Sequence, residues 1–245
     1  MNSYRDPHMI AFAPLFVVVR RLSNGRRPNG ALHVQDASGL KTSQCATPRS
    51  SWMKTDPAYE LLREFASPVV AITSAWGGRT NGMISDSAVR ASISPKVPRL
   101  AVQVHKWHLS HEFIWQSGLF TIHLLHRGQF DLVHRLGFVS GRDKDKLAEV
   151  SHRTGVTGVP VLDDCYAAFE CRVINTMDVG YATSFLGDVV RTTRGKGEEV
   201  MTASFFRSAM PAAWRDEFLA NYQMAQEVIE REREIKDVVW KKLER

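Results

Sequence analysis

The sequence predicts a mainly β fold, an antiparallel β-barrel with helical additions, from three observations. Short segments rich in apolar and β-branched residues recur between residues 68 and 191, and turn-forming residues separate them. Helical periodicity is limited to short stretches between these segments and to the end of the chain. Strands that are interrupted by helical insertions favour a barrel over a parallel α/β sheet.

The first 52 residues are expected to form a largely disordered basic extension, because they contain four prolines and no sustained helical or strand period. They carry a net charge of +5, which leaves +1 for the rest of the chain. Since Met53 stands just before a helix start, these residues are either a poorly ordered tail or the product of a mis-assigned translation start. Recruitment of a partner by this tail is a further alternative. Residues 53–206 are then the barrel domain, and residues 207–245 a C-terminal helical extension.

The barrel domain is expected to begin with a helix and a β-hairpin. Asp56 is a suitable N-cap, and Pro57 occupies the favoured first helical position. The buried stripe of this helix is expected to be Ala58, Leu61, Leu62 and Phe65. Residues 68–75 predict a strand, and the sequence Trp-Gly-Gly-Arg-Thr-Asn-Gly at 76–82 predicts a hairpin turn, because its residues tolerate positive φ.

Further strands and helices follow in alternation. Strands are expected at 83–88, 91–94, 99–104, 119–125, 166–177 and 183–191, the last two joined by a turn at 178–181. Helices are expected from Ser110, over 129–136 and over 144–150. From Pro211 the apolar residues recur at helical spacing and predict a long C-terminal helix, straight or bent. Because acidic and basic residues alternate on its polar face, we expect it to pack on the barrel or on a partner subunit.

Two segments predict a site for a cofactor that carries a phosphate. The segment 81–95 is rich in backbone donors and in short hydroxyl or carboxamide side chains, which suit a flat heterocycle and a polyol. The segment His-Lys-Trp-His-Leu-Ser-His-Glu at 105–112 places a lysine, histidines and Ser110 at the start of a helical pattern. Free backbone N–H groups at a helix start attract anions.

The order of these motifs resembles that of the flavin reductase-like family of FMN-binding split barrels. The resemblance covers roughly residues 55–192. It rests on Asn-Gly-Met-Ile-Ser-Asp-Ser at 81–87, Arg-Ala-Ser-Ile-Ser-Pro at 90–95, Ser-His-Glu-Phe-Ile at 110–114, Ser-Gly-Leu-Phe-Thr-Ile-His-Leu-Leu at 117–125, Ser-Gly-Arg-Asp-Lys at 140–144, and Thr-Ser-Phe-Leu-Gly-Asp-Val-Val at 183–190. It implies an antiparallel, Greek-key-like split β-barrel that binds FMN.

FMN binding needs donors for the ring, a polar lining for the ribityl chain and cationic or N–H groups for the phosphate. By the resemblance, residues 81–87 and 90–92 contact the ring and the ribityl chain, and residues at 105–110 hold the phosphate. The implied cofactor-binding residues are Asn81, Gly82, Met83, Ile84, Ser85, Asp86, Ser87, Arg90, Ala91, Ser92, His105, Lys106 and Ser110. Structural alternatives stay open, namely a turn dipeptide at Asn81-Gly82, a surface lysine at Lys106 and a helix cap at Ser110.

The resemblance also implies an NAD(P)H-dependent flavin reductase and a homodimer, because the flavin of this family lies near the subunit interface. Hydride would pass from the nicotinamide to the flavin, and electrons then to free flavin, a partner monooxygenase or another acceptor. No catalytic side chain is identified. Two departures are Ala182, where many members carry a histidine, and Asp86, where a small hydroxyl residue is usual. Ala182 favours the alternative of a non-enzymatic FMN electron carrier similar to flavoredoxin.

Other classes of function have little support in the sequence. Three cysteines without a Cys-x-x-Cys pair indicate neither a disulfide framework nor a zinc site, and a reduced, cytoplasmic setting is expected. Seven of the nine histidines fall within 105–152, but the period of three in His105, His108 and His111 does not place metal ligands on one strand face. The apolar run at 9–19 is shorter than the ~20 residues of a spanning helix, so no membrane partner is expected. A near-neutral barrel domain argues against nucleic-acid binding.

Overall fold

The computed structural model describes residues 62, 65 and 67–231 of the 245-residue chain. From residue 67 onward the described residues belong to one compact unit. The extension expected at 1–52 and the helix start at Asp56 lie outside the described residues. Leu62 and Phe65 are 59% and 76% exposed and belong to no described core cluster. The prediction that they form a buried stripe is therefore wrong at both positions.

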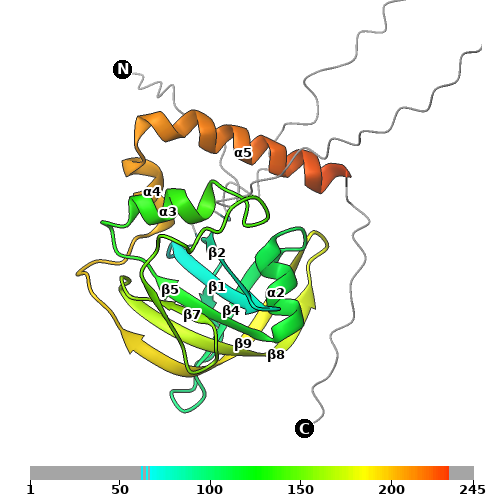
Figure 1. Ribbon diagram of the computed structural model, residues 1–245, viewed down its shortest axis with the longest axis vertical. Helices are drawn as coiled ribbons and strands as arrows, with labels where there is room; N and C mark the ends of the chain where they lie inside the picture. Colours follow the sequence, from blue (N-terminus) through cyan, green and yellow to red (C-terminus); the bar gives the residue numbers. More distant parts are fainter. Residues whose placement is uncertain (1–61, 63–64, 66, 232–245) are drawn as a thin grey trace, which may run out of the picture. The chain divides into compact units, whose positions relative to one another are not determined.

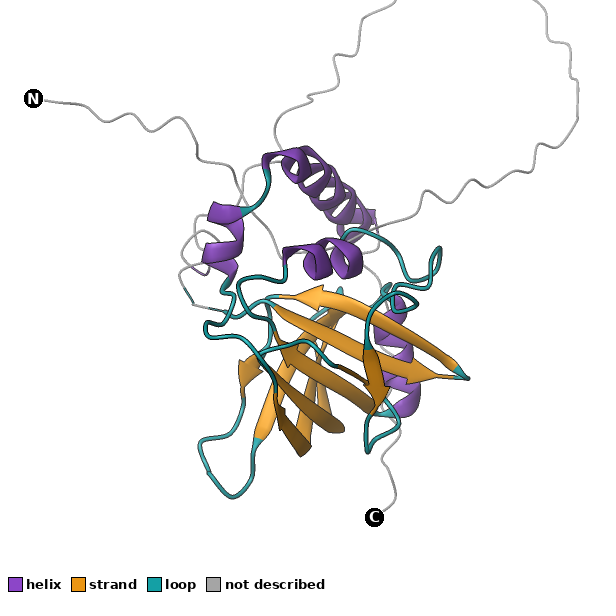
Figure 2. Cartoon of the chain, turned by 60° about the vertical axis from the view of Figure 1, so that its left-hand side comes forward, coloured by secondary structure: helices purple, strands orange, loops and turns teal. Residues whose placement is uncertain are grey.

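Seven antiparallel strands form one sheet that curls into a half-barrel (Figures 1 and 2). In spatial order they are β2 (Arg79–Ser85), β1 (Val70–Trp76), β5 (Leu119–Leu124), β8 (Ala167–Asp178), β9 (Ala182–Arg194), β4 (Arg99–His105) and β3 (Val89–Arg90). The pairs β5–β8 and β9–β4 join strands that are far apart in sequence, which is the Greek-key-like feature of the sheet. The prediction of a mainly β, antiparallel fold with helical additions is confirmed.

Two expected strands differ in their bounds. The β1–β2 hairpin turns at Gly77 and Gly78, whose φ angles of 58° and 75° favour glycine, so β2 begins at Arg79 and not at Met83. The strand expected at 91–94 is wrong: β3 comprises Val89–Arg90. Downstream of β3 the Ser92 hydroxyl bonds the backbone of Ser94, which competes with strand pairing.

Four helices of the described chain are added to this sheet, namely α2 (Leu109–Ser117), α3 (Phe130–Gly137), α4 (Ala203–Ala209) and α5 (Ala212–Arg231). In Figures 1 and 2, α3, α4 and α5 gather at one end of the half-barrel, whereas α2 lies on another side. The helices expected from Ser110, over 129–136 and from Pro211 are confirmed within one or two residues, while α4 was not expected. Within the described residues, no helix combines the length and hydrophobicity needed to cross a membrane.

The helix expected over 144–150 is wrong, because these residues form turns. The Leu147 N–H donates to Asp145 Oδ1 at 3.0 Å, and Lys146 Nζ donates to the carbonyl of Leu136 at 2.7 Å. These bonds stabilise local turns that compete with helical hydrogen bonding. A small hairpin of β6 (His152–Thr154) and β7 (Pro160–Leu162), which was not expected, follows this loop.

Two large clusters of buried side chains lie on the two faces of the sheet. The inner cluster includes Ile122, Phe120 and Phe185 from the strands and Ile114 from α2. The second cluster joins the outer side of β1 to α3, α4 and α5, and it includes Leu136, Phe206 and Phe218. Phe206 and Phe218 lie on either side of the domain boundary predicted at 206/207, and they share this cluster. The two clusters hold β1, β2 and α2 in fixed positions around the candidate site.

Candidate functional site

The turn between β4 and α2 brings aromatic and imidazole rings together. The His105 ring centroid lies 4.6 Å from that of Trp107, 5.4 Å from that of His108 and 5.1 Å from that of Tyr181. Backbone bonds fix the turn: the Lys106 N–H donates to the carbonyl of Tyr181 at 3.0 Å, and the His108 N–H to that of His105 at 3.1 Å. The turn is therefore anchored next to the start of β9.

Three ring nitrogens of this turn are buried and have no hydrogen-bond partner in the described part of the chain. They are His105 Nδ1, Trp107 Nε1 and His108 Nε2. A buried polar atom without a partner costs about 1–3 kcal/mol, and folded proteins contain few such atoms. Three of them in one turn mark a place where a bound ligand can complete the hydrogen bonding.

Burial keeps the imidazoles of this turn neutral. It lowers the pKa of His105 to about 4, with a smaller contribution from His111, and it lowers the pKa of His108 well below its usual value. Burial, followed by the charge of Lys106, lowers the pKa of His111 to about 4, and His111 Nε2 lies 2.8 Å from Thr183 Oγ1. Neutral imidazoles can donate or accept hydrogen bonds without adding charge to the site.

One buried polar contact joins β2 to α2. Asn81 Nδ2 donates to Ser110 Oγ at 2.8 Å, and both side chains are buried. The Gly141 backbone lies so close to the Asn81 amide that a Cβ at this position would collide with it. The contact brings together the two segments that were predicted to hold the cofactor, although they are 29 residues apart in sequence.

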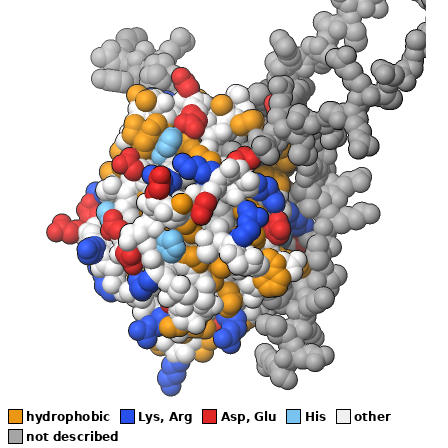
Figure 3. All heavy atoms as spheres, viewed as in Figure 1, with side chains coloured by type: hydrophobic (Ala, Val, Ile, Leu, Met, Phe, Trp, Pro, Cys, Tyr) orange, Lys and Arg blue, Asp and Glu red, His pale blue; other side chains and the backbone are white. Residues whose placement is uncertain are grey.

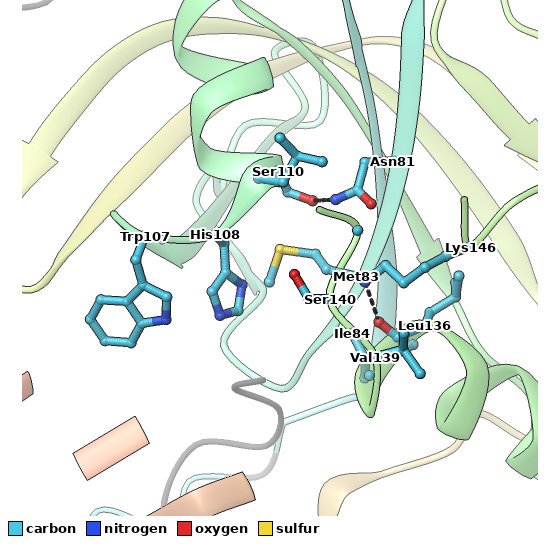
Figure 4. Close-up of a pocket in the computed structure, with 13 residues that line it drawn as sticks. Asn81, Met83, Ile84, Trp107, His108, Ser110, Leu136, Val139, Ser140 and Lys146 are labelled. Carbon is cyan, nitrogen blue, oxygen red and sulfur yellow. Dashed lines mark hydrogen bonds between the residues drawn. The ribbon is translucent and has the colours of Figure 1, made fainter. Parts of the chain in front are cut away.

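A small cavity lies beside this contact (Figure 4). Its volume of about 40 Å³ has room for about three water molecules at roughly 10–15 Å³ each. Of the predicted residues, Asn81, Met83, Ile84 and Ser110 line it. The other lining residues are Trp107, His108, Leu109, Leu136, Gly137, Val139, Ser140, Gly141 and Lys146. The cavity is therefore bordered by β2, by the start of α2 and by the loop after α3.

A larger groove opens onto the inner face of the half-barrel. Its volume of about 710 Å³ lies within the roughly 300–1,000 Å³ that is usual for small-molecule sites. Apolar side chains form much of its lining, among them Val70, Leu100, Ile122, Leu124, Phe169 and Val189. Of the predicted residues, Arg90 and Ser92 lie at this groove, and Arg99 lines it while paired with Asp188 at 2.7 Å. The groove offers an apolar surface next to cationic side chains.

The other predicted residues line neither of these two hollows. They are Gly82, Ser85, Asp86, Ser87, Ala91, His105 and Lys106. The Ser85 and Ser87 hydroxyls bond each other at 2.8 Å, and Ser87 Oγ donates to the carbonyl of Gln103 at 3.0 Å, which ties the end of β2 to β4. Lys106 Nζ forms an ion pair with Asp178 Oδ1 at 2.8 Å. A cofactor role for each of these residues stays a prediction.

Sequence reasoning missed several residues that line the small cavity, notably His108, Ser140 and Lys146. His108 belonged to the segment at 105–112 that was predicted to attract a phosphate, but it was given no role of its own. Ser140 was part of a recognised motif without an assigned role. Lys146 carried no signal, because it was placed on a helix that the structure replaces with turns.

Metal and thiol chemistry find no support in the described part of the chain. No group of three or more His, Cys, Asp or Glu side chains there is arranged to hold a metal ion. Cys165 and Cys171 are free thiols in buried positions. Burial raises the pKa of Cys165 to about 11 and that of Cys171 to about 12, so neither is a reactive thiolate near neutral pH.

The face of the molecule drawn in Figure 3 gives little support to a nucleic-acid site. On the face shown in Figure 3, basic and acidic side chains are interspersed, with hydrophobic side chains between them. A nucleic-acid site is typically a basic patch or stripe. The face in Figure 3 lacks such a patch among the residues that the structure describes.

Known proteins are similar to this chain in sequence and in fold. The sequence model of the family described as "Flavin reductase like domain" matches residues 62–213. A high molecular weight rubredoxin from Moorella thermoacetica is 32% identical over 55% of this chain and 59% of its own length. A ferric-chelate reductase (NAD(P)H) from Archaeoglobus fulgidus is 31% identical over 54% of this chain and 78% of its own length. The crystal structure of an FMN-binding protein from Thermus thermophilus matches with a TM-score of 0.52 and 26% identity, over 59% of this chain and 79% of that one.

Proposed function

Because this chain belongs to the flavin reductase-like family, we propose that it binds FMN and reduces it with NAD(P)H, passing the electrons to free flavin or to a partner oxygenase. The observation that carries the proposal is the hydrogen bond of 2.8 Å between Asn81 and Ser110. It joins in space the two segments whose sequences predict the ring side and the phosphate side of one cofactor.

The residues present fit FMN. The groove is large and apolar enough for a flat heterocycle, with Arg90 and Ser92 beside it. The β4–α2 turn supplies buried ring nitrogens without partners, at His105 and His108 among others. We therefore propose that residues 81–87 and 90–92 contact the ring and the ribityl chain, and that the β4–α2 turn and Ser110 lie at the phosphate end.

When bound, FMN supplies the redox chemistry: it accepts a hydride and passes electrons on. The side chains of this chain bind and orient, and no general acid or base is required of them. Apolar groove residues exclude water from the ring, and hydroxyls and backbone N–H groups fix its polar edge. Alignment of reactants in this way can account for several kcal/mol of a barrier, roughly 7–11 kcal/mol in the best intramolecular cases.

A specific observation favours a second candidate, a non-enzymatic FMN electron carrier. Ala182 is fully buried, and its methyl group cannot replace the polar contact of a histidine. If a histidine at this position were essential for nicotinamide binding, the chain would bind FMN without reacting with NADH or NADPH. Electrons would then arrive from a partner protein.

Flavin titration and anaerobic spectroscopy distinguish the two candidates. Apo-protein is titrated with FMN, riboflavin and FAD, and the FMN-loaded protein is then mixed with NADH, NADPH or dithionite without oxygen. We expect saturable FMN binding and bleaching of the flavin by a nicotinamide on a catalytic timescale. Reduction by dithionite alone identifies the carrier, and a folded protein that binds no flavin excludes both candidates.

We also propose that the chain forms a homodimer. Val89, Ile93 and Val97 lie around the large groove and the β3–β4 connection and are exposed, Ile93 to 96%. Neighbouring exposed apolar side chains of this size mark an interaction surface. Sedimentation should give the mass of a dimer for the wild type and of a monomer for Ile93→Glu. A partner monooxygenase and a cytoplasmic location are proposals that binding and localisation experiments can test.

A further inference from the structure

The small cavity beside Asn81 contains a buried cation that has no acidic partner among the described residues. Lys146 is 6% exposed, and its Nζ donates to the carbonyl of Leu136 at 2.7 Å. An ammonium group has three N–H donors, so one carbonyl satisfies only one of them. Among the described residues, no Asp or Glu lines the cavity. The charge of Lys146 is therefore uncompensated inside the cavity.

An uncompensated buried charge is costly, and a protein that keeps one usually has a use for it. Burial lowers the pKa of Lys146 to about 7, so the amine is only partly protonated at neutral pH. An anion in the cavity would stabilise the charged form. The position of Lys146 thus favours an anionic ligand over a neutral one.

The opposite side of the cavity provides further donors (Figure 4). Figure 4 shows His108 and Lys146 on opposite sides of the view, with Ser140 between them. His108 Nε2 is buried without a partner. Ser110 Oγ accepts its hydrogen bond from Asn81, so that its own hydroxyl proton can be donated to a ligand. The cavity therefore combines a cation with neutral donors.

The N-terminus of α2 also makes the electrostatic potential at the cavity more positive. α2 begins at Leu109, and no side chain caps its N-terminus. The N–H groups of a first helical turn have no partner within the helix, and they carry partial positive charge. After burial and His105, the charges of Lys146 and Arg142 contribute to the low pKa of His108, which places both cations near this end of the helix.

The size of the cavity narrows the class of ligand. A volume of about 40 Å³ has room for about three water-sized groups. A phosphoryl group presents three strong acceptor oxygens. A flavin ring or a nicotinamide would not fit in this space.

We propose that this cavity binds a phosphoryl group or a similar tetrahedral oxyanion, with Lys146 as the cation and Ser110 and His108 as further donors. The proposal deepens the proposed function, because the phosphate of FMN is one source of this group; a free inorganic oxyanion is the other. Lys106, the cation expected from the sequence, pairs with Asp178 and is not part of the cavity lining. Lys106 then holds the β8–β9 hairpin in place, and Lys146 binds the anion.

The test compares Lys146→Met with a matched control, Lys144→Met, and with Lys106→Met, which removes the cation expected from the sequence. Lys144 is an exposed lysine on the same loop, so its loss removes a neighbouring lysine that does not line the cavity. Dissociation constants are measured for FMN and for riboflavin, which lacks the phosphate, and inorganic phosphate is titrated by calorimetry. We expect Lys146→Met to weaken FMN binding by tenfold or more, with less than a twofold effect on riboflavin and with loss of phosphate binding. Lys144→Met should retain the wild-type ratio of FMN to riboflavin affinity, and Lys106→Met should lower it less than Lys146→Met does.

Several outcomes separate this proposal from the proposed function. Equal losses for FMN and riboflavin in Lys146→Met, or a selective loss of FMN in Lys106→Met alone, would overturn it. If the wild type binds neither flavin, the proposed function fails, while phosphate binding that depends on Lys146 still supports the oxyanion site. A wild type that binds no phosphate and does not prefer FMN over riboflavin overturns the site.

Folding is checked by circular dichroism, because Lys146→Met leaves the carbonyl of Leu136 without its donor. If this variant does not fold, Ser110→Ala decides the question. It leaves Lys146 in place and should reduce the preference for FMN over riboflavin by several-fold. A Ser110→Ala variant that is folded and keeps the wild-type preference would overturn the proposal.

Discussion

Two histidines of this protein are buried in different regions, and they differ in how their nitrogens are used. His123, in β5, places Nδ1 3.2 Å from the carbonyl of Ala71, and its Nε2 accepts the N–H of Leu162 at 3.0 Å. His108, in the β4–α2 turn, has a buried Nε2 without a partner. In both cases burial is the largest cause of a lowered pKa.

The comparison teaches that burial and a shifted pKa do not by themselves identify a functional side chain. Both nitrogens of His123 are consumed by the fold, since they connect β5 to β1 and to β7. His108 retains a nitrogen that the fold does not use, at the edge of a cavity that holds Lys146. A buried nitrogen without a hydrogen-bond partner, and not a shifted pKa, distinguishes the histidine of the candidate site from the histidine of the core.

The largest expected effect is a loss of stability in mild acid. Burial lowers the pKa values of His105, His111 and His123 to about 4, below the unfolded value of 6.5. The unfolded chain therefore binds more protons between these values, so the stabilisation is complete above pH 6.5 and is lost as the pH falls towards 4. Each histidine can contribute on the order of 3 kcal/mol. Urea unfolding of the apo-protein from pH 7 to pH 4.5 should show this decline.

The same titration sharpens the comparison when it is repeated with His123→Gln. This variant lacks one of the titrating groups, so its free energy of unfolding should depend less steeply on pH in this window. The window lies above the ordinary range of carboxyl groups, which limits their contribution. A wild-type stability that stays constant from pH 6.5 to pH 4.5 would contradict the assignment of neutral, buried histidines.

The second prediction concerns His123, the histidine whose nitrogens are used by the fold. His123→Leu should lower the free energy of unfolding by about 1–3 kcal/mol, because it leaves the buried N–H of Leu162 without its acceptor and removes the side-chain bond to the carbonyl of Ala71. Riboflavin and FMN affinities of the folded fraction should be unchanged, since His123 lies in neither hollow. Urea unfolding at pH 7 and flavin titration measure the two quantities. A loss of flavin affinity without a loss of stability would reverse the roles of the two histidines.

Much of the fold could be predicted from the sequence, because its signals are local. The β-branched run at 68–75 and the alternation at 99–104 identify two strands, and the glycines at 77 and 78 identify the turn between β1 and β2. The helix expected over 144–150 was wrong because Lys146 makes a non-local bond to the carbonyl of Leu136, and no periodicity reports such a bond. Short strands such as β6 and β7 were missed because three residues carry little pattern.

The candidate site could be predicted only in part, because its contacts join residues that are far apart in sequence. Asn81 and Ser110 were singled out by turn and helix-start chemistry, and the structure brings them into contact. Lys106 was singled out because it precedes a helix in sequence and lies in a motif of the resemblance, whereas Lys146 was given no role. Its partner Asp178 is far along the chain, at the end of β8, so the ion pair could not be anticipated from sequence.

The third prediction concerns His108, the histidine at the candidate site. His108→Leu should change the free energy of unfolding by no more than about 1 kcal/mol, because the lost Nε2 has no partner to leave unsatisfied. FMN affinity should fall by about tenfold, which corresponds to about 1.4 kcal/mol, if His108 donates to the anion. Riboflavin serves as the control ligand. A strong loss of stability with unchanged FMN affinity would place His108 with His123 as a part of the core.

The smallest effect is expected at the buried thiols, which resemble His123 because the fold uses their polar atoms. Cys165 Sγ lies 3.8 Å from the carbonyl of Leu162, and Cys171 Sγ lies 3.5 Å from that of Phe169. Burial also raises the pKa of both thiols to about 11 or 12, so little thiolate is present at pH 8. In a Cys45→Ser background, a thiol reagent should label neither residue in the native protein and both in denaturant, and incubation with it should leave flavin binding unchanged. Rapid labelling of Cys165 in the native protein would show that the region around His123 opens, and that its hydrogen bonds contribute less to stability than its burial suggests.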